Sequence, residues 1–125
     1  MAIKKVSQQV IKEDIWHKIG SAGEPAFQNS WVNYETVETN WSHAYFMKDA
    51  MGFVHIKGMV KSGSPVTSVI FTLPAGYRPL KYHRWATISY DALANMEIRG
   101  NGEIVVVAGN AGWLNLGLVT FKAEQ

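Results

Sequence analysis

The chain has 125 residues, of which 47% are hydrophobic and 18% charged, and its formal net charge is +2. This length fits one globular domain, and the composition excludes a disordered chain. Cysteine is absent, which excludes disulfide bridges, thiolate metal sites and a cysteine nucleophile. The basic residues are spread along the sequence and form no basic stripe, so we expect no nucleic-acid binding.

No hydrophobic run approaches the roughly 20 residues that span a bilayer. The start of the chain also lacks the hydrophobic stretch of a signal peptide, so we expect neither membrane insertion nor export by the usual signal route. Aromatic residues are the unusual feature, since five Trp, five Tyr and five Phe make up 12% of the chain. Such a load suits a packed core, and it also suits a surface that contacts sugar rings or another protein.

Residues 1–24 are predicted to be an arm that precedes the main domain. Ile3, Val6 and Val10 recur at spacings of three and four residues, which is typical of a heptad seam. Two helical turns do not hold alone in water, so a short helix, an extended arm and the stub of a coiled-coil stalk all stay open. Residues 20–25 have the Gly, Ser and Pro content of a linker. The main domain is therefore predicted to span residues 25–125.

Beyond this linker nearly every segment has the composition of a β-strand. In chain order the predicted strands are 31–34, 41–47, 53–60, 67–73, 85–90, 95–99, 103–107 and 113–121. Gly100-Asn101-Gly102 is a strong hairpin signal. Pro74 and Pro79 bracket a corner, because proline cannot donate to a strand ladder. Short strands with regular turns predict an all-β fold, either an antiparallel β-sandwich or a jelly-roll-like barrel.

Five segments, in this order, resemble a known family. They are residues 27–34, residues 45–49 with 52–58, residues 70–79, residues 100–104 and residues 112–118. Together they resemble the C-terminal head domain of tail-fibre and receptor-binding proteins of tailed phages, above all phages of Gram-positive hosts. One departure is the segment 35–41, where relatives tend to be rich in glycine.

This resemblance implies a β-sandwich or jelly-roll head that is normally a homotrimer. It implies a place in the virion, in a tail appendage made in the host cytoplasm. The implied partners are further copies of the chain, other tail or baseplate proteins of the virion, and a glycan or protein of the host cell surface.

The sequence offers no recognisable catalytic or metal centre. The four histidines, His17, His43, His55 and His83, are scattered, and none belongs to a zinc-binding pattern. Most carboxylates fall in predicted turns or on polar strand faces, where solvated surface charge explains them. Nucleophile-elbow, phosphate-loop and dinucleotide motifs are missing as well. We therefore expect a protein that is not an enzyme, with no catalytic residue, no bound metal and no cofactor.

The first candidate binding group is His83, Arg84 and Trp85, followed by Tyr90 and Asp91. A Trp platform with Arg, His and Asp nearby can stack on a sugar ring and hydrogen-bond its hydroxyls. Burial at a subunit interface is an equal alternative for Trp85, because interfaces favour Trp and Arg.

The second candidate binding group is Trp41, His43 and Tyr45, which share a face if residues 41–47 form a strand. Burial of these side chains in the core is an equal alternative.

Two functions from different classes follow. The first is a phage head domain that adheres to host cell-surface polysaccharide or protein. The second is a purely structural virion component, such as a head or neck fibre tip or a trimerisation cap. Both need the same core and the same subunit interface, so both stay open at this point. A depolymerising enzyme is disfavoured, because glycosidases need two facing carboxylates.

Overall fold

The computed structural model describes residues 14–117 and 119–125, and these residues are all-β with no helix among them. The strands are β1 (His17–Lys18), β2 (Val32–Asn33), β3 (Tyr45–Lys48), β4 (Phe53–Lys57), β5 (Met59–Lys61), β6 (Val66–Thr72), β7 (His83–Ser89), β8 (Ala92–Ile98), β9 (Glu103–Ala108), β10 (Leu114–Asn115) and β11 (Val119–Lys122). The helix or stalk predicted near the N-terminus falls on residues 1–13, which lie outside the described residues.

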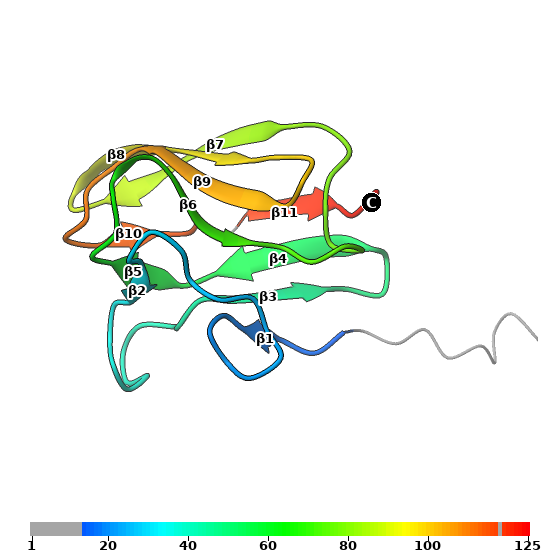
Figure 1. Ribbon diagram of the computed structural model, residues 1–125, viewed down its shortest axis with the longest axis horizontal. Coiled ribbons are helices and arrows are strands. Elements are labelled where there is room, and N and C mark those ends of the chain that lie inside the picture. The colour runs from blue at the N-terminus through cyan, green and yellow to red at the C-terminus, as the bar shows by residue number, and fades with distance from the viewer. Residues whose placement is uncertain (1–13, 118) are drawn as a thin grey trace, which may run out of the picture.

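The strands form two facing layers (Figure 1). One layer is the four-stranded sheet β6-β9-β8-β7, and the other is the sheet β1-β3-β4-β11 together with the smaller sheet β10-β5-β2. Every strand pair is antiparallel. The described strands do not close into a barrel, and the predicted antiparallel β-sandwich is confirmed.

Gly58 divides the predicted strand 53–60 into β4 and β5. Its φ is 133°, and a Cβ at this position would lie 2.6 Å from the Cα of Ala44. The Gly58 carbonyl accepts a hydrogen bond of 2.9 Å from the Leu116 N–H, so the bend keeps contact with the neighbouring strand. The predicted strand 113–121 is likewise divided into β10 and β11, with Gly117 at a φ of 85° between them. The alternating pattern of residues continues through Gly58 and Gly117, so the sequence did not reveal that the strands are divided there.

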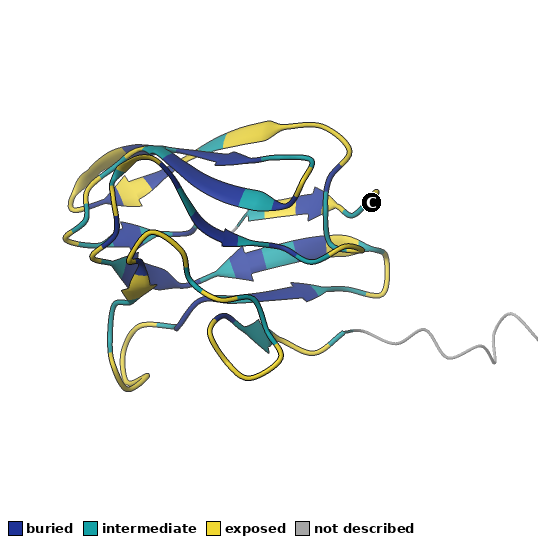
Figure 2. Ribbon diagram, in the orientation of Figure 1, coloured by how far each residue is buried: buried dark blue, intermediate teal, exposed yellow. Residues whose placement is uncertain are grey.

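The hydrophobic core fills the space between the two layers, where the buried residues of both sheets face each other (Figure 2). Trp31, just before β2, is 1% exposed and donates its indole N–H to the Ser68 hydroxyl at 3.0 Å. Its ring lies on Gly63, where a Cβ would come within 2.1 Å of the indole. This contact fixes the start of β2 against β6, and the chain that follows β2 forms the candidate site.

Residues 14–24 pack against the sandwich. β1 pairs with β3 at its edge, and Ile19 is 1% exposed within the core. The His17 ring stacks on Phe46 at a centroid distance of 4.9 Å, and its nitrogens lie 2.6 Å from an Asp14 oxygen and 2.8 Å from a Glu24 oxygen. The Tyr77 hydroxyl also donates to Asp14. The described part of the predicted arm therefore adds an edge strand to the lower sheet.

Hydrogen bonds within the cluster of Asp14, His17, Glu24 and Tyr77 shift the pKa values of His17 and Asp14. Partial burial alone would lower the pKa of His17, but the hydrogen bonds to Glu24 and Asp14 outweigh it and raise this pKa. Burial alone would raise the pKa of Asp14, but the hydrogen bonds from Tyr77 and His17 lower it. At pH values below the ordinary pKa of histidine, protonated His17 between two carboxylates thus stabilises the attachment of β1. This contribution is lost as the pH rises through the raised pKa of His17.

Candidate functional site

Three loops meet at one end of the sandwich, on the left in Figure 1. They are the loop 34–44 between β2 and β3, the β7–β8 turn at Tyr90-Asp91, and the loop 109–113 between β9 and β10. Two cavities lie on either side of the loop 34–44. We call them the aromatic cavity and the polar cavity.

The aromatic cavity has a volume of about 320 Å³, which is within the usual range for small-ligand sites. Its lining residues come from all three loops and from the start of β5, and they are Tyr34, Trp41, Met59, Asp91 and Trp113. Trp41 is 50% exposed, so its ring is available to a ligand. Three aromatic rings and one carboxylate around a space of this size form an arrangement suited to a ring with hydroxyl groups.

A two-residue turn places the carboxylate of this cavity. Tyr90 and Asp91 have φ values of 49° and 65°, and two consecutive positive values are typical of the tight type I′ hairpin turn. The Tyr90 ring lies 6.5 Å from the Trp113 ring, centroid to centroid. Asp91 is exposed, and among the hydrogen bonds and ion pairs of the described residues none involves its carboxylate. The carboxylate is therefore free to accept hydrogen bonds from a ligand.

Ser89 holds the loop that carries Trp113. It is 2% exposed, and its hydroxyl lies 3.0 Å from the Asn110 carbonyl and 2.8 Å from the Trp113 carbonyl. The same hydroxyl accepts the Asn110 N–H at 2.8 Å. A buried hydroxyl at the end of β7 thus positions Trp113 beside the turn that carries Asp91.

The carboxylate of Glu35 organises the loop that carries Trp41. It accepts hydrogen bonds from the Thr39 hydroxyl at 2.6 Å, from the Asn40 N–H at 2.9 Å and from the Trp41 N–H at 2.7 Å. Glu38 continues the network, because it accepts the His43 N–H at 2.7 Å and the Tyr45 hydroxyl at 2.9 Å.

These bonds all favour the ionised carboxylates. The Thr39 hydroxyl, followed by the Trp41 N–H, lowers the pKa of Glu35 to about 2. The His43 N–H is the main cause that lowers the pKa of Glu38. Both side chains are therefore negative and hydrogen-bonded at neutral pH.

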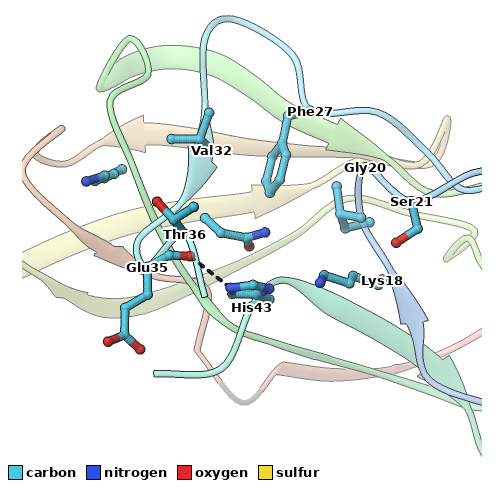
Figure 3. A pocket seen from close by; sticks show the side chains of 11 residues that line it. Lys18, Gly20, Ser21, Phe27, Val32, Glu35, Thr36 and His43 are labelled. Carbon is cyan, nitrogen blue, oxygen red and sulfur yellow. Dashed lines mark hydrogen bonds between the residues drawn. The ribbon is translucent and has the colours of Figure 1, made fainter. Parts of the chain in front are cut away.

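The polar cavity lies on the other side of this loop and has a volume of about 540 Å³ (Figure 3). Its walls come from β1, the segment between β1 and β2, β2 itself, the end of β5 and the loop 34–44. The lining residues are Lys18, Ile19, Gly20, Ser21, Phe27, Val32, Asn33, Glu35, Thr36, His43 and Lys61. His43 is 5% exposed, and its Nε2 donates to the Glu35 carbonyl at 2.8 Å. A carbonyl only accepts, so Nε2 carries a proton, while Nδ1 is enclosed without a partner among the described residues.

A search of the solved structures matches the receptor binding protein (gp15) of Listeria phage PSA, with a TM-score of 0.65, 15% sequence identity, and coverage of 99% of this chain and 73% of that chain. The chain shares the fold of a phage receptor-binding protein. The resemblance drawn from five sequence segments is thereby confirmed at the level of the fold. No family model matches the sequence. No curated protein matches it either.

The structure divides the first predicted group: His83, Arg84 and Trp85 line one cavity with residues of β11, and Tyr90 and Asp91 lie elsewhere. Trp85 is in β7 and Tyr90 follows the end of this strand, so at about 3.3 Å per residue the five residues from one to the other span roughly 16 Å. Trp85 is half-buried and donates its indole N–H to the Leu116 carbonyl at 3.2 Å. Arg84 pairs with Glu97 at 2.9 Å, and His83 is exposed at the start of β7. Tyr90 and Asp91 lie in the turn at the other end of the strand, beside the aromatic cavity.

The second predicted group is also divided. Residues 41–44 are not a strand, so Trp41, His43 and Tyr45 do not share a face. Trp41 lines the aromatic cavity and His43 the polar one. Tyr45 is in β3, where its ring faces Trp16 at a centroid distance of 6.4 Å.

Trp41, Tyr90 and Asp91 therefore meet at one end, although Trp41 was predicted in the second group and Tyr90 and Asp91 in the first. Tyr34 and Trp113 complete this end and were not predicted. Trp113 was predicted to begin the strand 113–121, and no local pattern places it next to Trp41.

Among the described histidines and carboxylates, no three or more are grouped so that they could hold a metal ion. Within the same part of the chain, no helix is long and apolar enough to cross a membrane.

The order of the loop 34–44 is predicted to depend on the charge of Glu35. Because the pKa of Glu35 is lowered from 4.5 to about 2, the ionised carboxylate holds the loop fully above pH 4.5 and releases it as the pH falls through about 2. The amide signal of Trp41, followed by NMR, should titrate with a midpoint near 2. Glu35→Gln should abolish this titration and speed amide exchange at Asn40 and Trp41. A midpoint near 4.5 would show that the Glu35 bonds do not form.

Proposed function

We propose that the chain is the head domain of a phage tail-fibre or receptor-binding protein, and that it adheres to a host cell-surface polysaccharide through the aromatic cavity. The observation that carries this proposal is the meeting of Trp41, Trp113 and Asp91 at one end of a sandwich with the fold of a phage receptor-binding protein. The same proposal places the domain in the virion, in a tail appendage made in the host cytoplasm, with other tail or baseplate proteins as partners.

The chemistry of the aromatic cavity favours a sugar. Aromatic faces pack against the C–H face of a sugar ring, and a free carboxylate accepts hydrogen bonds from its hydroxyls. A single carboxylate lines this cavity, whereas glycoside hydrolysis needs a pair. Binding without cleavage is therefore the proposed role, and the domain is proposed to be non-enzymatic.

A second surface supports self-association as a homotrimer. In a solvated antiparallel sheet the outward positions are normally polar, but the outer face of β6-β9-β8-β7 carries an exposed apolar patch beside the polar residues Arg84, Asn95 and Glu97. The exposed apolar residues of this face are Val66, Ala86, Ile88, Leu93 and Ala108, and the strand registers place Val66, Ala108 and Ala86 in one row with Asn95. Figure 2 shows exposed residues along this upper layer. An apolar face of this kind is typical of a protein interface, and we propose copies of the same chain as its occupants.

This apolar face also favours the second candidate function, a structural fibre tip or trimerisation cap. Assembly alone would explain the outer face, but it leaves the exposed Trp41 and the free carboxylate of Asp91 without a role. Adhesion is therefore the better-supported function, and the two experiments below separate the alternatives.

Trimer formation is predicted to depend on Leu93, which is 78% exposed on the apolar face, opposite Ile88 and near the β7–β8 turn. Leu93→Asp places a charge in each copy of the interface and should convert a trimer into monomers in sedimentation at micromolar concentration. Met51→Asp is the control, because Met51 is 70% exposed in the β3–β4 turn, away from this face. A wild-type chain that sediments as a monomer would contradict the proposed trimer.

Adhesion is predicted to depend on Trp41. Loss of one stacked ring costs about 1 kcal/mol or more of binding free energy, in addition to the buried contact area that is lost. Trp41→Ala should therefore weaken the binding of the fluorescently labelled domain to host cells roughly tenfold. Asp91→Asn should weaken it as well, because an amide replaces one acceptor oxygen with a donor. The control is Trp16→Ala, since Trp16 is 40% exposed beside β3 and outside the cavity. Full labelling by Trp41→Ala, or no labelling of any host by the wild type, would favour the structural role.

A further inference from the structure

We propose that the polar cavity binds an anionic oxygen group, a phosphate or a carboxylate, between Lys18 and Lys61. This site is separate from the aromatic cavity, and its ligand chemistry does not depend on a sugar in that cavity. The argument rests on the charges and on the hydrogen-bonding groups that the cavity wall leaves unused.

The two lysines reach the cavity from different sheets. Lys18 ends β1 at the edge of the lower sheet, and Lys61 ends β5 opposite Val32 of β2. In Figure 3 the nitrogen of Lys18 is directed toward the ring of His43, into the space below Phe27. Among residues 14–117 and 119–125, neither lysine forms an ion pair with a carboxylate. Both ammonium groups thus line one cavity without an ion-pair partner among the described residues, while the Lys61 Nζ also lies 5.6 Å from the centroid of the Tyr34 ring.

The oxygen acceptors of Glu35 and Glu38 near these lysines are already used, whereas His43 Nδ1 stays without a partner among the described residues. The Glu35 carboxylate is held by the Thr39, Asn40 and Trp41 donors, and in Figure 3 it points away from Lys18 and Phe27. The Glu35 carbonyl accepts the His43 ring N–H. Glu38, which lies near enough to Lys18 for the lysine to help lower its pKa, is occupied by the His43 N–H and the Tyr45 hydroxyl.

The groups that remain are mainly donors. The Asn33 side-chain oxygen accepts the Ala44 N–H at 2.8 Å, which leaves its NH₂ group available. Ser21 and Thr36 add two hydroxyls to the wall, and both residues are exposed. A cavity with two ammonium groups, an amide NH₂ and two hydroxyls favours a ligand that brings acceptors and negative charge. A phosphate or carboxylate supplies both, whereas a neutral sugar hydroxyl supplies no charge.

The position of the cavity connects this inference with adhesion. The loop 34–44 forms one wall of both cavities, with Tyr34 and Trp41 on one side and Glu35, Thr36 and His43 on the other. A polysaccharide that carries an anionic group next to a sugar ring could therefore contact both sides of this loop. Binding of the anion alone is the claim to be tested.

The test is a titration of the full chain with inorganic phosphate and, in a second arm, with acetate, followed by amide NMR shifts at constant ionic strength in chloride. We expect saturable shifts at Gly20, Ser21 and Thr36 with at least one of the two anions, and the arm that saturates identifies the group. Lys18→Gln and Lys61→Gln should each weaken binding about tenfold, the effect of losing one charge-assisted contact. Lys18→Arg should retain binding, because it keeps the charge.

The matched control is Lys81→Gln, which removes the same charge from an exposed position outside the cavity. The absence of saturable shifts with both anions would overturn the proposal. Equal weakening by Lys81→Gln would also overturn it, since it would show a general charge effect. Either failure leaves the aromatic cavity proposal standing, because that proposal is tested by Trp41→Ala on host cells.

Discussion

The carboxylate of Glu35 is the constraint on which both candidate cavities depend. One side chain gathers the backbone N–H groups of Asn40 and Trp41 and the hydroxyl of Thr39, and thereby gives a fixed shape to a segment that has no strand or helix. The shape places Trp41 on one side of the loop and His43 on the other. Without this carboxylate, we expect both cavities to lose the wall that the loop 34–44 supplies.

The sandwich supplies the fixed frame against which this loop is held. Trp31 fixes the entry into β2 through Gly63 and Ser68, and Ser89 fixes the loop 109–113 at the end of β7. Three loops far apart in the sequence thus meet at one end of two packed sheets. Recognition residues on loops held by a rigid scaffold are a common arrangement in binding proteins, and here the rest of the scaffold presents an apolar face suited to assembly.

The sequence predicted the fold more fully than the site. Alternation and turn residues located most strands, and Gly100-Asn101-Gly102 marked the β8–β9 hairpin. The Tyr90-Asp91 turn escaped because positive φ values are usually signalled by Gly or Asn, and neither is present there. The division at Gly58 depends on the approach of Ala44, a contact from the segment that precedes β3. Trp41 and Asp91 were predicted as binding residues, but only tertiary packing could pair them with each other and with Trp113.

The central claim is that the loop end of the sandwich contacts the host. Hydrogen–deuterium exchange of the full chain, with and without purified cell-wall polysaccharide of the host, tests it most directly. The account predicts slower exchange in residues 34–41, 90–91 and 110–113 when the polysaccharide is present, with little change at the start of β7. Protection confined to residues 83–85, or no protection in any of the three loops, would contradict it.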